Sequence, residues 1–134
     1  MEIGTFVLLY LLALPVFFAI DLLWLGVIAK NFYNRELEPV MGDIRWGAAI
    51  SFYLLYIVGL VLFAIMPGYS SGDTQMAILV GAAFGFFTYA TYDMTNLATL
   101  KHWSVKVVVV DILWGVVLGS SVTYVTLLLA SFFL

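Results

Sequence analysis

No cysteine occurs among the 134 residues of the chain, which excludes disulfides and thiolate metal sites. Charged residues are also scarce, at 10% of the sequence against about 25% in a typical soluble domain. The basic residues are too few and too scattered to form the patch that nucleic-acid binding requires. Hydrophobic residues, in contrast, make up 65% of the chain. This composition predicts an integral membrane protein, with a single membrane domain over residues 1–134 and the lipid bilayer as its partner.

Four hydrophobic segments are each long enough to cross a hydrocarbon layer about 30 Å thick, which takes about 20 residues. They cover about residues 5–29, 47–66, 76–100 and 104–132. We therefore predict an all-α fold, a polytopic antiparallel bundle of four transmembrane helices. The first segment follows Glu2 rather than a basic start, which favours a retained helix over a signal peptide.

The basic residues are distributed unequally between the connections. Residues 31–46 read as a solvent-facing connection with a short interfacial helix, and residues 67–75 as a turn without any Lys or Arg. All five Lys and Arg residues lie in or beside the first and third connections: Lys30, Arg35, Arg45, Lys101 and Lys106. Because connections rich in Lys and Arg remain in the cytoplasm, we predict that both termini are extracytoplasmic.

Three aspartates lie inside the predicted spans, at Asp21, Asp93 and Asp111. At a rise of about 1.5 Å per residue, each lies roughly 8–14 Å inside the cytoplasmic edge of its helix. A charge at the centre of a membrane helix costs about 2.5–3.5 kcal/mol on insertion scales. Helix stability does not require that cost, so carboxylates at a common depth in three helices indicate a functional site.

Residues spaced by four place these acids on the faces where helices pack. One stripe in the third span and one in the fourth consist of Gly81, Gly85, Tyr89 and Asp93, continued by Asn96, and of Asp111, Gly115, Gly119 and Thr123. Each stripe contains a GxxxG motif, which allows close approach of helix backbones in lipid. The acids are therefore predicted to face the inside of the bundle.

Aromatic residues accompany the acids at regular spacing. Trp24 follows Asp21 by three positions, and Trp114 follows Asp111 in the same D-x-x-W pattern. Aromatic faces beside carboxylates can hold a cation. We predict a ligand-binding site that contains Asp93, Asp111, Asp21, Asn96, Tyr92, Tyr89, Trp24 and Trp114.

Three segments carry a family resemblance: FFAIDLLWLG, TYDMTNLATLKHW and DILWG. In these segments the chain resembles a group of small bacterial inner-membrane proteins known as domain of unknown function 2177. The resemblance covers nearly the whole chain, and it implies a four-helix protein of the bacterial inner (plasma) membrane. It implies no particular chemistry.

Three functions fit these features. The first is the binding or transport of a small cation or protonated amine, and because four helices are too thin to enclose a wide path, transport implies a homo-oligomer. The second is an enzyme acting on a lipid or isoprenoid at the cytoplasmic leaflet. There, Asp93, Asn96 and Asp111 would hold a divalent cation, or Asp93 and His102 would act as acid and base. The third is a structural or assembly protein organised by its GxxxG motifs.

The aspartates also have a purely structural interpretation. In that case they pair with Lys101, Lys106 or Arg45, or accept hydrogen bonds from Tyr and Trp, and lock the bundle together. No signature of a resident metal, such as D-x-x-x-D or H-E-x-x-H, occurs in the sequence. The sequence likewise identifies no cofactor, and it leaves transport, catalysis and assembly open.

Overall fold

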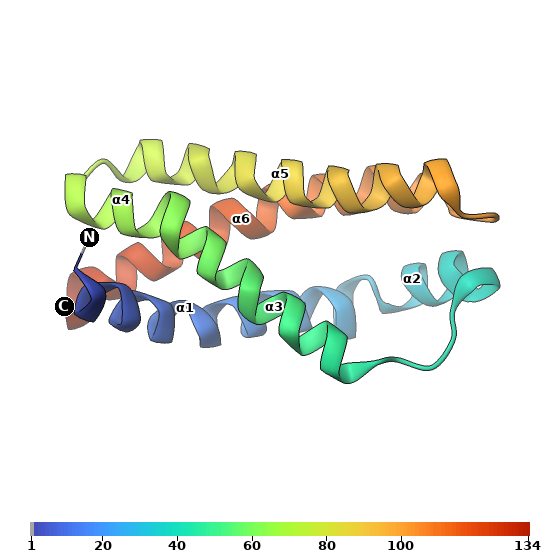
Figure 1. The fold of residues 1–134 in the computed structure, drawn as a ribbon, viewed down its shortest axis with the longest axis horizontal. Coiled ribbons are helices and arrows are strands. Elements are labelled where there is room, and N and C mark those ends of the chain that lie inside the picture. Colours follow the sequence, from blue (N-terminus) through green and yellow to red (C-terminus); the bar gives the residue numbers. More distant parts are fainter. Residues whose placement is uncertain (1) are drawn as a thin grey trace.

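Four long helical segments run along the molecule, and each is long and apolar enough to cross a membrane (Figure 1). The structure is a computed structural model that describes residues 2–134. The spans are Ile3–Ile28, Trp46–Ser71, Thr74–Thr99 and Val105–Phe133. The predicted all-α fold with four candidate membrane helices is confirmed.

The first span changes its helical geometry at its end. Helix α1 (Ile3–Leu23) continues without a break through Pro15 and is followed by a π-helical turn, η1 (Trp24–Ile28). The chain then bends at Ala29 into helix α2 (Lys30–Leu37), which is eight residues long, and a 3-10 turn, η2 (Glu38–Val40). The short helix expected in the first connection is therefore present.

The second span is longer than the sequence predicted. Helix α3 (Trp46–Leu60) leads through a π-helical turn, η3 (Val61–Ile65), into helix α4 (Met66–Ser71). The prediction of a turn over residues 67–75 was wrong for residues 67–71, which are helical. Pro67 lacks an N–H and its ring clashes with the carbonyl four residues earlier, and the wider π-helical turn relieves that clash. The helix ends at Gly72, whose φ of 75° is the left-handed conformation that glycine adopts most easily.

The last two spans form a tight hairpin of helix α5 (Thr74–Thr99) and helix α6 (Val105–Phe133). Their backbones meet at the four glycines of the predicted stripes. A Cβ at Gly85 would lie 1.8 Å from the carbonyl oxygen of Gly115, and one at Gly119 would lie 2.0 Å from that of Gly81. Only residues without a side chain permit this approach, so the two GxxxG motifs serve the contact between α5 and α6.

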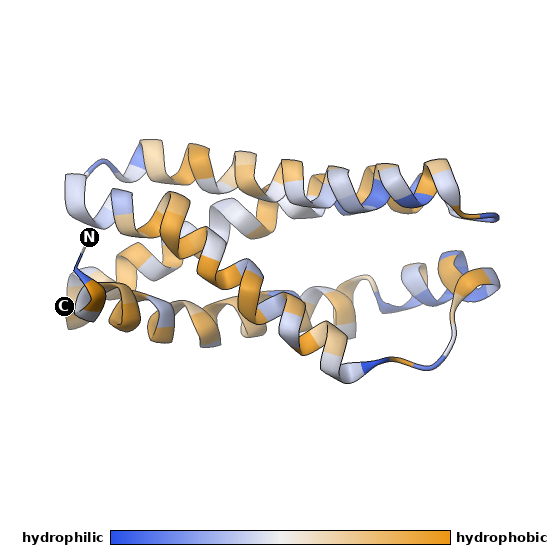
Figure 2. Cartoon of the chain, in the orientation of Figure 1, coloured by the Kyte–Doolittle hydropathy of each residue, from blue (hydrophilic) through white to orange (hydrophobic). Residues whose placement is uncertain are grey.

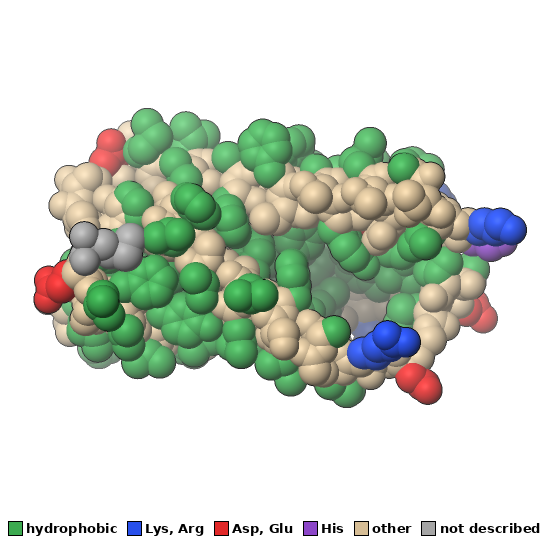
Figure 3. Space-filling view, in the orientation of Figure 1, with side chains coloured by type: hydrophobic (Ala, Val, Ile, Leu, Met, Phe, Trp, Pro, Cys, Tyr) green, Lys and Arg blue, Asp and Glu red, His purple; other side chains and the backbone are tan. Residues whose placement is uncertain are grey.

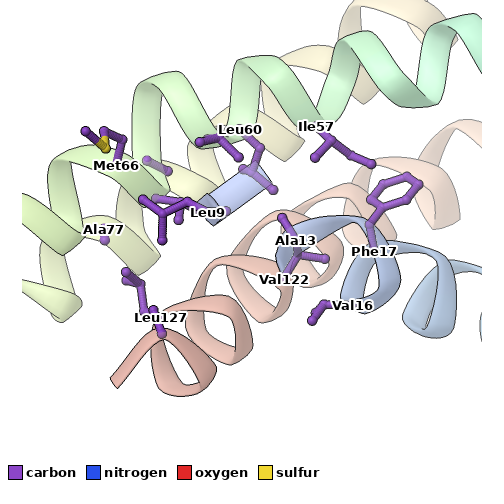
Figure 4. Packing of buried hydrophobic residues seen from close by; sticks show 14 of the residues in the cluster. Leu9, Ala13, Val16, Phe17, Ile57, Leu60, Met66, Ala77, Val122 and Leu127 are labelled. Carbon is purple, nitrogen blue, oxygen red and sulfur yellow. The ribbon is translucent and has the colours of Figure 1, made fainter. Parts of the chain in front are cut away.

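The hydrophobic core fills the half of the molecule that contains both termini. Phe17 of α1, Leu60 of α3 and Val122 of α6 are among its almost fully buried side chains (Figure 4). Both termini lie at one end of the bundle, and α2 and the α5–α6 turn lie at the other, which we call the α2 end (Figure 1). Hydrophilic residues gather at the α2 end, in α2 and in the last turns of α5 (Figure 2).

Candidate binding cavity

A cavity of about 510 Å³ lies toward the α2 end, where α3 diverges from α5 (Figure 1). Cavities of about 300–1,000 Å³ are typical of sites for small molecules. Its lining residues come from every span and from the first connection: Asp21, Leu25, Lys30, Tyr33, Asn34, Leu37, Met41, Ile44, Ala49, Phe52, Tyr53, Thr88, Tyr89, Tyr92, Asp111 and Trp114. Figure 3 shows a hollow between the α3 and α5 sides of the molecule.

Helix α2 forms one wall of the cavity. Its lining residues are Lys30, Tyr33, Asn34 and Leu37, which occupy positions i, i+3, i+4 and i+7. This spacing places them on a single face of the helix. Helix α2 is therefore an amphipathic cover whose inner face supplies a cation, a phenol, an amide and an apolar group.

Asp21 lies on the α1 wall and is 3% exposed. The indole Nε1 of Trp114, on α6, donates a hydrogen bond to Asp21 Oδ1 at 3.2 Å. Trp114 in turn stacks on Trp24, whose ring lies behind it rather than in the cavity wall. The carboxylate is thus held by an aromatic residue from the other D-x-x-W motif.

Asp111 lies on the α6 wall and is 8% exposed. The hydroxyl of Tyr33 donates a hydrogen bond to Asp111 Oδ1, and the indole Nε1 of Trp24 donates to the Tyr33 oxygen at 3.2 Å. Burial, followed by the hydrogen bond to Asp111, raises the pKa of Tyr33 above its usual value. The phenol therefore stays protonated and remains a donor, and it ties α2 to α6.

Asp93 occupies a different environment from the other two acids. Its side chain is 0% exposed, and neither carboxylate oxygen has a hydrogen-bond partner among the described residues. It lies beside Asp111 on the packed side of α5 and does not line the cavity. Asn96, one turn further on, is half-buried and does not line the cavity either.

The comparison with protein families agrees with this architecture. A family model described as predicted membrane protein (DUF2177) matches residues 6–128. The chain belongs to this family. The match confirms the resemblance indicated by segments such as TYDMTNLATLKHW, and the DUF2177 description identifies a membrane protein without specifying a ligand. No curated protein and no solved structure matches the chain.

The predicted ligand-binding residues of this DUF2177 protein divide into two groups. Those that line the cavity are Asp21, Tyr89, Tyr92, Asp111 and Trp114. Trp24 supports the wall from behind through its stack on Trp114, whereas Asp93 and Asn96 lie outside the cavity. Within residues 2–134, no three His, Asp or Glu side chains are grouped closely enough to hold a metal ion.

The structural interpretation of the aspartates is only partly reproduced. Within the described chain, the single ion pair joins Arg35 to Glu36 at 3.3 Å, and neither of these residues lines the cavity. Asp21 and Asp111 therefore make no ion pair, and each accepts a hydrogen bond from Trp or Tyr instead. A carboxylate has about four acceptor sites, so one hydrogen bond leaves capacity for a ligand.

Sequence reasoning missed the contribution of α2. The sequence used Lys30 only to orient the chain and placed Tyr33 and Asn34 in a solvent-facing connection. Lys30 and Asn34 are indeed exposed, but all three residues also line the cavity. The spacing K-x-x-Y-N-x-x-L over residues 30–37 is the signal that indicates one shared helical face. It does not reveal which neighbour that face covers.

Proposed function

We propose that the protein binds an amphiphilic molecule through a protonated amine head, at the leaflet next to the α2 end. The observation that carries the proposal is the presence of two buried carboxylates, Asp21 and Asp111, in the wall of a largely aromatic and apolar cavity. A buried carboxylate is costly without a counter-charge, and an ammonium group supplies both a charge and hydrogen-bond donors.

The aromatic rings of the cavity favour the same ligand. Tyr53, Tyr89 and Trp114 line it together with the two acids. The interaction of a cation with the face of Trp or Tyr contributes about 0.5–2 kcal/mol, and the contribution is larger where water is excluded. The combination of carboxylates and ring faces therefore suits an organic ammonium better than a neutral or anionic head.

The direction of the opening supports an amphiphile rather than a fully water-soluble amine. The hollow in Figure 3 faces sideways with respect to the helix axes, between α3 and α5. In a membrane-spanning bundle that direction is the lipid. Leu25, Met41 and Phe52 also line the cavity, and they provide apolar surface for a hydrocarbon segment.

We further propose that the α2 end is cytoplasmic. Lys30 and Arg35 belong to α2, and Lys101 lies in the α5–α6 turn, so the basic residues gather at that end. The positive-inside rule then places both termini outside.

Binding is favoured over transport by the packing of the opposite half. Leu9, Leu60 and Val122 are 0% exposed and belong to the core that fills the terminal half of the bundle. A transport path would have to pass through this core. The scaffold alternative is weakened as well, because the glycines of both GxxxG motifs are already occupied by the contact between α5 and α6.

An enzyme acting on a lipid would use the same cavity, and its sideways opening fits a lipid substrate as well as a ligand. The two possibilities differ in the fate of the bound molecule. Recovery of the amphiphile unchanged after incubation with the purified protein is expected for a binding protein. A converted product would replace binding with catalysis.

The test uses the full chain in dodecyl maltoside, with dodecylamine as the probe and dodecanol as its neutral counterpart. A ligand of the folded state raises stability by mass action, by about 2.7 kcal/mol at a concentration of 100 Kd. We expect dodecylamine to raise the Tm of the unaltered protein and of Asp43→Asn, which changes an exposed acid of the connection. Asp21→Asn and Asp111→Asn should lose the effect. An equal rise with dodecanol, or a full rise in both cavity variants, would overturn the proposal.

A further inference from the structure

The cavity contains charges of both signs. Besides Asp21 and Asp111, it is lined by Lys30 and by Asn34 one turn further along α2. Within residues 2–134, no ion pair joins Lys30 to either acid. The ammonium group of Lys30 is therefore not used to neutralise the buried carboxylates, although it belongs to the same cavity.

The two kinds of charge come from separate walls. The acids are carried by α1 and α6, and each is oriented by a hydrogen bond from an aromatic residue. Lys30 is carried by α2, on the face that includes Tyr33 and Asn34. The Tyr33 hydrogen bond to Asp111 fixes α2 against α6 and so keeps the basic wall beside the acidic one.

We propose that the ligand head is zwitterionic, with an anionic phosphate in addition to the amine. This inference rests on the proposed function and specifies its ligand class as an amphiphile with a phosphoethanolamine-type head. The amine contacts Asp21 and Asp111, and the phosphate contacts the ammonium of Lys30 and the amide N–H donors of Asn34. Lysine is well suited to phosphate as a compact point charge with three donors.

A zwitterionic head explains why the charges of the cavity are not paired internally. Asp21 and Asp111 are buried and Lys30 is exposed, so the two ends of the head would meet groups that are free to bind it. Charge-assisted hydrogen bonds of this kind are roughly twice as strong as neutral ones. An amine without the phosphate would leave Lys30 unused and would be repelled by its charge. The cavity should therefore discriminate between amphiphiles that differ only in the phosphate.

The experiment compares two probes with the same hydrocarbon chain, dodecylamine and dodecylphosphoethanolamine, with dodecyl phosphate as the third member of the set. Binding to the full-length protein in dodecyl maltoside is measured by thermal shift as a function of probe concentration. We expect dodecylphosphoethanolamine to bind at least about tenfold more tightly than dodecylamine, which corresponds to ~1.4 kcal/mol. Dodecyl phosphate should bind more weakly than either.

Lys30→Gln should abolish this preference, because it removes the contact to the phosphate and so weakens binding of dodecylphosphoethanolamine. By removing a like charge from the cavity wall, it should also strengthen binding of dodecylamine. Lys30→Arg should restore most of the preference. Arg35→Gln is the matched control, because it removes the same charge from the same helix at a position outside the cavity. Equal affinity for the two amines, or an unchanged preference in Lys30→Gln, would overturn the zwitterionic assignment and leave the amine site intact. If none of the three probes binds to the unaltered protein, both proposals are overturned.

Discussion

Trp24 and Trp114 stack face to face, with their ring centroids 4.5 Å apart and their planes inclined by 7°. The stack joins the first span to α6. The indole N–H of each Trp is hydrogen-bonded, directly or through Tyr33, to the aspartate of the other D-x-x-W motif. Trp114 donates to Asp21, and Trp24 donates to Tyr33, which donates to Asp111. The two D-x-x-W motifs therefore exchange partners across an antiparallel pair of helices.

Trp114→Phe tests the energetic value of this exchange. The variant keeps an aromatic ring against Trp24 and removes the hydrogen bond to the buried Asp21. Leaving a buried polar group without its partner costs about 1–3 kcal/mol, so we expect a lower unfolding free energy by that amount in detergent. Trp46→Phe is the control, because Trp46 is 64% exposed. Equal losses of unfolding free energy in the two variants would show that the hydrogen bond to Asp21 does not contribute to stability.

Gly119→Ala tests the contact between α5 and α6. The added methyl group would lie 2.0 Å from the carbonyl oxygen of Gly81, so the helices must separate. Overpacking of this kind costs about 1–3 kcal/mol, and a clash with backbone relaxes poorly. Gly47→Ala has no heavy atom within 4 Å of the new methyl group and should be neutral or slightly stabilising. A comparable unfolding midpoint for the two variants would contradict the close approach.

The attachment of α2 should depend on pH through Glu36. The hydroxyl of Ser104 donates to Glu36 Oε1 at 2.9 Å, and this hydrogen bond, followed by that from Arg35, holds the pKa of Glu36 below its usual 4.5. A depressed pKa stabilises the attached form above pH 4.5, and the contribution disappears as pH falls through the lower folded-state value. The protection of the α2 amides from hydrogen exchange, measured relative to the intrinsic exchange rate at each pH, should therefore decrease on acidification below pH 4.5.

Glu36→Gln should remove that dependence on pH and leave a weaker, pH-independent contact with Ser104. Glu38→Gln, two positions further along and exposed, is the matched control and should retain the loss of protection at low pH. If both variants respond to pH in the same way as the unaltered protein, Glu36 does not control the attachment of α2.

Reporter fusions test the proposed orientation. Alkaline phosphatase joined after Leu134 should be active, since the C-terminus is expected outside the cytoplasm, and the same enzyme inserted after Gly42 should be inactive. Fusions to green fluorescent protein should give the opposite pattern. Active phosphatase at Gly42 would place α2 and the cavity at the outer leaflet and reverse the assignment.

The fold was largely predictable because its main determinants are local. Span length and hydropathy determine the number of helices, and the fourfold spacing of Gly81, Gly85, Gly115 and Gly119 identifies the packing faces. The second span was underestimated at Pro67, because a proline normally ends a helix and no local pattern indicates the π-helical turn that relieves its clash.

The candidate site was predictable to a smaller extent. The depth argument grouped Asp21 with Asp111, and helical spacing added Tyr89; all three line one cavity, and their part in ligand binding stays a prediction. The same argument placed Asp93 with them, but its position on α5 directs it into the hairpin contact, where a common depth says nothing about a common cavity. Tyr33 was missed because its partner is 78 residues away and only tertiary structure brings α2 under α6. Homo-oligomerisation stays a prediction.

The π-helical turn at Trp24–Ile28 sets the rotational position of helix α2, which follows it. In a π-helical turn each hydrogen bond spans one more residue than in an α-helix. Here the N–H of Ala29 donates to the carbonyl oxygen of Trp24, five residues earlier, at 2.7 Å. A single residue corresponds to about 100° of rotation in an α-helix. If the same residues formed a regular α-helix, the inner face of α2 would therefore be rotated by about that angle, and Lys30, Tyr33 and Asn34 would leave the cavity wall. The single extra residue of this turn thus brings the polar face of α2 into register with the cavity that the first span lines.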